Sequence, residues 1–138
     1  MSISNNTEQL RKQHENINAL IKENIKLVND KNLELHAPTI AKNISVLAGI
    51  LQIHLSHEDQ YLYPNLLNSD KPEIRNKAKA YIDEMGNLKA VYTDFKNKYN
   101  TKSKLMSNPT AFEMDFFAVF GAVEKRMTKE DSDLYLLL

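Results

Sequence analysis

The stretch ISVLAGILQIHLSHEDQYLYPNLL, residues 44–67, decides how this chain is expected to fold. Apolar residues in and just before it recur at the four-then-three spacing that is typical of one buried helix face: Ile40, Ile44, Leu47 and Leu51. His54 and Glu58 continue the same spacing. A histidine and a carboxylate therefore fall where the helix should present apolar core residues.

The same spacing recurs in the rest of the chain. A first segment, with Ser4 and Thr7 as cap candidates, shows it at Leu10, Ile17, Ile21 and Val28. The second segment has Pro38 in its first turn and continues the spacing to Tyr61, and a third segment shows it at Ile74, Ala78, Tyr81, Met85, Leu88, Tyr92, Phe95 and Tyr99. A fourth segment, with Asn108 as cap and then Pro109, shows it at Phe112, Phe116, Val119, Val123 and Leu137. Polar stretches at residues 68–72 and 100–108 separate these segments. We therefore predict an all-α protein, an up-down-up-down antiparallel four-helix bundle, with residues 1–138 as one domain.

Composition limits the classes of partner. The 138 residues include 18 basic and 18 acidic side chains, so no strong field attracts nucleic acid or an anionic membrane. Cysteine is absent, which excludes disulfides and cysteine-ligated metals. No apolar run approaches the roughly 18 residues of a membrane span, and the first residues do not have a signal-peptide pattern. We expect a cytoplasmic protein without nucleic-acid or membrane partners, and a homodimer or another protein partner stays open.

Polar residues interrupt three of the four apolar stripes. They are His14, His54, Glu58, Arg126 and Glu130. In an antiparallel bundle all five fall in the half that contains both chain ends, so we expect one cluster. Buried groups of this kind must be paired, hydrogen-bonded or bound to metal.

The spacing of His54 and Glu58 is suited to metal binding. Residues four apart lie on one helix face about one turn apart. An imidazole nitrogen and a carboxylate oxygen can then converge on one ion, and that mixed set suits iron, manganese or zinc. Alone, the pair is also common on helix surfaces without any ion. Its place in a core stripe, at the level of His14, favours a metal site.

An internal repeat appears when the chain is shifted by 72 residues. HLSHEDQYLYPNL, residues 54–66, then lies over RMTKEDSDLYLLL, residues 126–138, with five of 13 positions identical. The chain thus looks like two related helix pairs. In this alignment Arg126 replaces His54, and Met85 takes a place similar to that of His14.

These motifs resemble the hemerythrin-like, or HHE cation-binding, four-helix bundles. The resemblance covers nearly the whole chain and rests on His14, on H54-x-x-x-E58-D-x-x-L-Y-P64 and on R126-x-x-x-E130-D-x-x-L-Y135. It implies a non-haem iron centre, mononuclear or di-iron, in a protein that binds O2 or nitric oxide, stores or senses iron, or acts in stress responses. The first half keeps the three ligands expected of it. The second half keeps Glu130, while Met85 and Arg126 stand where histidines are expected.

The candidate site residues follow from the stripes and the resemblance together. We expect metal ligation by His14, His54, Glu58, Glu130 and Glu84, with Arg126, Met85 and His57 close by. Simpler roles stay open: His14 as a core histidine, Glu130 as the ion-pair partner of Arg126, and Glu84 as an exposed carboxylate. Arg126 either acts as a tethered positive charge among the carboxylates or extends to solvent. We place His36 in the turn before the second helix, and expect Tyr63 and Tyr135 to pack and hydrogen-bond.

Three functions compete at this point. The first is a metal protein that binds or senses O2, nitric oxide or iron. The second is a metal-free bundle that acts through protein contacts, its former site vestigial. The third is a peroxidase- or oxidase-like di-iron enzyme. No evident nucleophile, phosphate-binding loop or substrate pocket argues for hydrolysis or group transfer, so we expect binding or sensing and leave the enzyme alternative open.

Overall fold

The prediction of an all-α fold is confirmed. The computed structural model describes the backbone of residues 3–137 and the side chains of residues 8–84 and 86–137. Within that part of the chain every regular element is helical. The elements are α1 (Ile3–Asn29), α2 (Leu33–His57), η1 (Glu58–Leu62), α3 (Tyr63–Leu67), α4 (Pro72–Met85), α5 (Leu88–Tyr99), α6 (Lys102–Met106), α7 (Pro109–Lys129), η2 (Glu130–Leu134) and η3 (Tyr135–Leu137).

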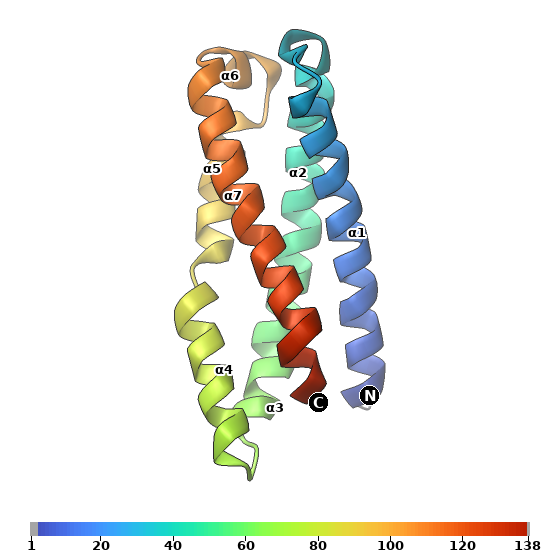
Figure 1. Cartoon of the computed structure of the whole chain (residues 1–138), viewed down its shortest axis with the longest axis vertical. Coiled ribbons are helices and arrows are strands. Elements are labelled where there is room, and N and C mark those ends of the chain that lie inside the picture. Colours follow the sequence, from blue (N-terminus) through green and yellow to red (C-terminus); the bar gives the residue numbers. More distant parts are fainter. Residues whose placement is uncertain (1–2, 138) are drawn as a thin grey trace.

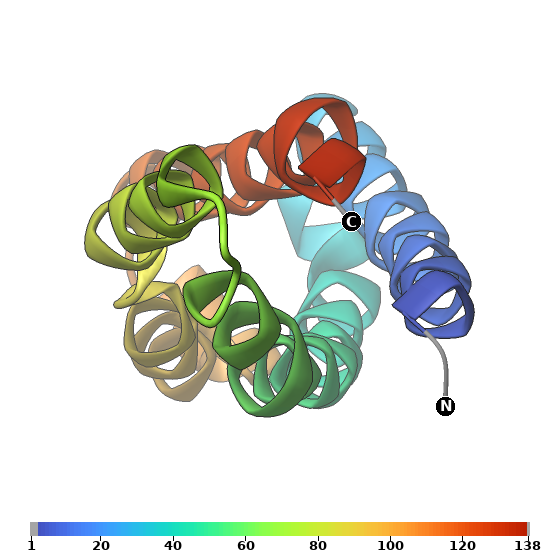
Figure 2. The ribbon, with the colours of Figure 1, turned by 90° about the horizontal axis from the view of Figure 1, so that it is seen from below.

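The helices form one elongated bundle. In Figure 1 the chain runs along α1 away from the end marked N, returns along α2, goes back through α4 and α5, and returns along α7. Seen from below, these segments surround a common centre (Figure 2). Contacts join α1 to α2, α2 to α5, α5 to α7 and α7 to α1. Both ends of the chain therefore lie at the same end of the bundle (Figure 1).

The third predicted helix is divided in two. The apolar stripe suggested one helix, but α4 ends at Met85 and α5 begins at Leu88. Gly86 lies in the turn between them, and its N–H donates to the carbonyl oxygen of Ile82 at 2.8 Å. A Cβ atom at Gly86 would collide with that same oxygen. Glycine is thus required at this position, and its low helix propensity helps to end α4 there.

Two boundary predictions were wrong at the turn between the first helices. Helix α2 already begins at Leu33, so His36 and Pro38 lie inside it. The N–H of His36 donates to the carbonyl of Asn32 at 3.2 Å, and His36 Nε2 pairs with Asp30 Oδ2 at 2.7 Å. These contacts extend the helix by one turn before the proline.

Two other helix starts were also predicted. Ser4 and Thr7 do not begin α1, which starts at Ile3, and their side chains lie outside the described residues. Asn108 does cap α7, because its side chain accepts a hydrogen bond from the N–H of Ala111 at 3.1 Å.

The predicted loop at residues 100–108 contains the short helix α6. Thr101 caps it by accepting a hydrogen bond from the N–H of Lys104 at 3.2 Å. The loop was predicted because the stretch is mostly polar, but it contains Leu105, whose side chain is fully buried in the core. Burial of this leucine holds the connection against the far end of the bundle.

A π-helical turn occurs in each copy of the internal repeat. η1 contains EDQYL and η2 contains EDSDL, each beginning at the glutamate of the repeat. A π turn carries about one extra residue relative to an α-helix, which rotates the side chains that follow. The predicted stripe reached Tyr61, which is 53% exposed, whereas Leu62 and Tyr63 are buried. The inserted turn explains why that prediction was wrong.

The apolar core has two parts, one on each side of the polar residues. The large cluster extends from Leu51, Leu55, Val123 and Met127 to the end of the bundle remote from the chain ends. The small cluster lies toward the termini and contains Leu10, Leu62, Tyr63, Leu66, Ala78, Tyr81, Leu134 and Tyr135. Along their helices, the buried residues His14, Glu58 and Glu130 come between the two clusters. His54 and Arg126, which are also buried, lie one turn before Glu58 and Glu130. The bundle therefore contains a polar layer enclosed by apolar packing.

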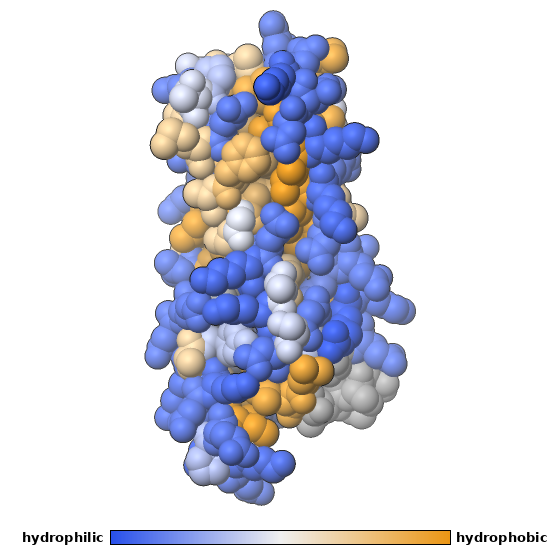
Figure 3. Space-filling model, in the orientation of Figure 1, coloured by the Kyte–Doolittle hydropathy of each residue, from blue (hydrophilic) through white to orange (hydrophobic). Residues whose placement is uncertain are grey.

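The surface is largely hydrophilic on the face shown in Figure 3, where hydrophobic side chains gather mainly in the upper half. Large exposed hydrophobic side chains include Leu35, Ile53, Met114 and Leu136. Among the described residues, no helix is both long enough and apolar enough to cross a membrane.

Candidate metal centre

Four side chains from separate parts of the chain meet in the polar layer. His14 comes from the middle of α1, His54 from the last turn of α2, and Glu58 and Glu130 from the first positions of η1 and η2. Each offers one nitrogen or oxygen atom, and these four atoms lie within 4.8 Å of one another. His14 is 2% exposed and the other three are 0% exposed. The group is therefore compact and closed off from bulk water.

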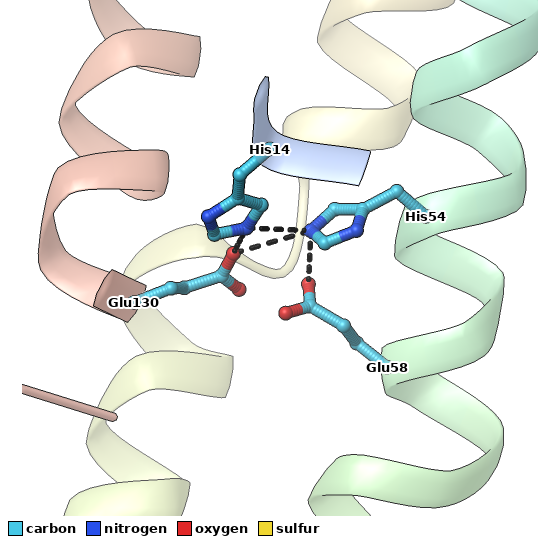
Figure 4. Close-up of side chains that lie close together, drawn as sticks. All are labelled: His14, His54, Glu58 and Glu130. Carbon is cyan, nitrogen blue, oxygen red and sulfur yellow. Dashed lines mark hydrogen bonds and ion pairs between the residues drawn. The ribbon is translucent and has the colours of Figure 1, made fainter. Parts of the chain in front are cut away.

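The atoms that face one another are the ones that bind metals. His14 Nε2 lies 2.9 Å from His54 Nε2 and 2.9 Å from Glu130 Oε1. His54 Nε2 lies 3.3 Å from Glu130 Oε1 and 3.4 Å from Glu58 Oε1. Figure 4 shows both imidazole rings pointing into the space between the two carboxylates.

A second set of contacts fixes the orientation of the imidazoles. His14 Nδ1 lies 3.0 Å from Asp131 Oδ1, and His54 Nδ1 lies 2.7 Å from Gln13 Oε1. Both partners are acceptors, so each ring donates its Nδ1–H outward. In the neutral imidazole the Nε2 lone pair then points into the centre. Partners of this kind are typical of histidines that bind metal ions.

The centre therefore contains mainly hydrogen-bond acceptors. Two Nε2 lone pairs and two carboxylates converge, and acceptors at these distances repel unless a proton or a cation lies between them. One nearby donor is the hydroxyl of Tyr135, which lies 2.9 Å from Glu58 Oε2 and 2.9 Å from His14 Nε2. A single hydroxyl proton cannot satisfy the whole group.

A buried arginine adds one positive charge on the other side of the carboxylates. Arg126 Nη2 donates to Glu58 Oε1 at 3.2 Å, and Arg126 Nε donates to Glu130 Oε2 at 3.3 Å. Its Nη2 also lies 3.4 Å from the hydroxyl of Tyr63. Arg126 is 4% exposed, so the alternative in which it extends to solvent is excluded.

The pKa values of His14 and Glu58 also indicate that the group is stabilised by positive charge. Burial, together with the neighbouring Glu130, raises the pKa of Glu58 to about 8. Burial alone would lower the pKa of His14, but the hydrogen bond and charge of Glu130 outweigh it, and the pKa is raised. Burial lowers the pKa of His54 to about 4, which keeps this ring neutral. Without a metal ion, protons held near His14 and Glu58 partly neutralise the carboxylates.

Glu84 lies away from this group. Its carboxylate is exposed and pairs with Lys129 Nζ at 2.8 Å and Lys125 Nζ at 3.3 Å. Its exposed place on α4 matches the simpler role left open for it.

His57, expected close to the site, lies outside the four-residue group. The ring of His57 is half-buried and packs edge-on against Tyr61 with centroids 5.1 Å apart, on the outer side of α2. Met85 ends α4, and its side chain lies outside the described residues.

The expectation that Tyr63 and Tyr135 pack and hydrogen-bond is confirmed, but neither was expected at the centre, and Asp131 and Gln13 were not predicted at all. Tyr135, Tyr63, Asp131 and Gln13 all contact the four-residue group or Arg126. The repeat carried a signal for the tyrosines, because Tyr63 and Tyr135 are equivalent in it. The π turns then rotate both tyrosines inward. Asp131 carried the same signal, because it matches Asp59 in the repeat, whereas Gln13 carried none and merely precedes a predicted ligand.

Comparison with known protein families identifies the family of the chain. The model of the hemerythrin HHE cation binding domain matches residues 5–138. No curated protein matches the chain. No solved structure matches it either.

Removal of the arginine tests whether the buried carboxylates need it. In metal-free protein we expect Arg126→Met to lower the free energy of unfolding by about 3–5 kcal/mol, because two buried carboxylates lose their partner. Chemical denaturation followed by circular dichroism measures this change.

Lys125→Met is the matched control on the neighbouring position of α7. Lys125 pairs with Glu84 at the surface, so its replacement should leave the free energy of unfolding nearly unchanged. Equal effects of the two substitutions would contradict the role assigned to Arg126.

Proposed function

Because the chain belongs to the hemerythrin HHE cation-binding family, we propose that its polar layer binds iron through His14, His54, Glu58 and Glu130. The observation that carries this proposal is the convergence of two imidazole Nε2 atoms and two carboxylates inside 4.8 Å. A cation among these atoms would turn mutual repulsion into attraction. Protons would stabilise the group less than a metal ion would, because one proton cannot be shared by four acceptors at once.

The chemistry of the donor set supports iron. Two imidazoles with carboxylates are a mixed nitrogen and oxygen set, which suits iron and manganese, and zinc as well. Sites with two histidines and carboxylate ligands leave positions open on a ferrous ion for a small exogenous ligand. On this basis we propose that the bound ion interacts with O2 or nitric oxide and that the protein binds or senses one of them.

The residues around the ion would control its surroundings. Asp131 and Gln13 hold the two rings in place through their Nδ1–H groups. The apolar clusters on both sides keep bulk water away. Tyr135 presents a hydroxyl to the inner side of the layer, where it lies beside Glu58 and His14.

A second function is favoured by one observation. The guanidinium of Arg126 already binds one oxygen of each buried glutamate, so the fold has an internal way of neutralising them. On that reading the chain is a metal-free bundle that acts through a protein partner. Metal analysis separates the two functions: iron loading of about one or two ions per chain supports the first, and less than about a tenth supports the second.

Two histidines on one helix provide the test of the ligands. We expect His54→Ala to lose bound iron, because its Nε2 lies at the middle of the group, whereas His57→Ala keeps the iron content of the wild type. Glu84→Gln should also keep it, since Glu84 lies at the surface. The measurement is iron per chain by plasma emission after anaerobic loading and desalting, with circular dichroism to show that each variant folds. Equal losses from His54→Ala and His57→Ala would contradict the assignment.

Metal affinity should depend on pH. Metal binds the deprotonated ligands, and the pKa values of Glu58, about 8, and of His14 are raised in the metal-free protein. Bound protons must therefore be displaced at neutral pH, and affinity should fall as the pH is lowered from about 8 to about 6. Competition with a chelator of known affinity, corrected for the protonation of the chelator, measures the trend. An affinity that stays constant over this range would show that the ion does not bind at these groups.

A further inference from the structure

We propose that the guanidinium of Arg126 occupies the place of a second cation, so that the centre holds a single metal ion beside a fixed arginine charge. This inference rests on the proposed function, because it concerns the same four ligands. It assigns Arg126 as the residue that sets how many ions the site accepts.

The two oxygens of Glu130 face different groups. Oε1 lies 2.9 Å from His14 Nε2 and 3.3 Å from His54 Nε2, on the side where the imidazole lone pairs converge. Oε2 receives a hydrogen bond from Arg126 Nε at 3.3 Å. A carboxylate that bridges two cations uses its two oxygens in the same way. Here one side of the bridge is the imidazole pair and the other is the guanidinium.

Glu58 completes the enclosure of the arginine. Its Oε1 accepts a hydrogen bond from Arg126 Nη2 at 3.2 Å, and the hydroxyl of Tyr63 lies 3.4 Å from the same nitrogen. The guanidinium thus lies among two carboxylates and a tyrosine with only 4% of the residue exposed. The space beside the carboxylates is already filled by a group that cannot lose its charge.

Charge opposes a second ion. Two buried carboxylates and one arginine carry a formal charge of about −1, so one divalent ion brings the group to about +1 and two would bring it to about +3. An excess of that size, away from water, is strongly unfavourable. One divalent ion leaves the smaller imbalance.

The internal repeat shows what the substitution changed. Arg126 is the counterpart of His54, and Glu130 is the counterpart of Glu58. A histidine at this position would present a lone pair, whereas a guanidinium has five donors and no acceptor. The second half of the chain therefore contributes a carboxylate and a positive charge where the first half contributes a carboxylate and a ligand nitrogen.

The experiment counts ions in the intact protein and in three variants at position 126. Arg126→His replaces the charge by a ligand, Arg126→Lys keeps the charge, and Arg126→Gln removes it at similar length. Each protein is loaded anaerobically with Fe²⁺, desalted and analysed for iron per chain. In parallel, Mn²⁺-loaded wild type is studied by electron paramagnetic resonance, which distinguishes an isolated ion from an exchange-coupled pair and needs no substitution.

We expect about one ion per chain in the wild type and in Arg126→Lys, and a rise toward two in Arg126→His. If Arg126→His does not fold by circular dichroism, Arg126→Gln takes its place and should also exceed one ion. The Mn²⁺ spectrum of the wild type should be that of an isolated ion.

The contrary results separate this inference from the proposed function. Two ions per wild-type chain, or the spectrum of a coupled pair, would overturn the inference and leave metal binding in place. One ion in the wild type and in the folded neutral variants alike would also overturn it, because Arg126 would not limit the site. No ion in any of the four proteins would overturn the proposed function itself.

Discussion

Two carboxylates are buried inside the helical bundle, and the need to neutralise them shapes the residues around them. Glu58 and Glu130 are fully buried, and a charge in that position requires a positive partner. Positive charge can reach the two glutamates from two sides. The imidazoles of His14 and His54 present a place for a cation, and the guanidinium of Arg126 lies on the far side of the glutamates.

The same constraint shapes the backbone. Each glutamate begins a π-helical turn, and each turn is followed by a tyrosine that points back to the polar layer. Because the two turns occupy equivalent places in the internal repeat, the layer has an approximate symmetry that Arg126 breaks. Apolar clusters above and below then hold the layer away from water. The bundle can thus be described as two apolar cores joined through one charged layer.

Much of this arrangement could be predicted from the sequence because helix periodicity is a local property. Breaks in the apolar stripes identified His14, His54, Glu58, Arg126 and Glu130, all of which lie in the layer. Predictions failed where the helix departs from ideal spacing. The π turns moved the buried position from Tyr61 to its neighbours, and the turn at Gly86 divided a continuous stripe. Glu84 could not be placed, because a carboxylate near a stripe turns inward or outward according to its partners, here two lysines.

In the proposed metal-bound state, one metal ion and one arginine together neutralise the buried glutamates. A crystal of iron-loaded protein, measured at the iron absorption edge, tests it most directly. We expect a single anomalous peak beside His14 Nε2, His54 Nε2 and Glu130 Oε1, with the guanidinium of Arg126 still in contact with both glutamates. A second peak in the place of the guanidinium, or a peak only elsewhere on the protein, would contradict it.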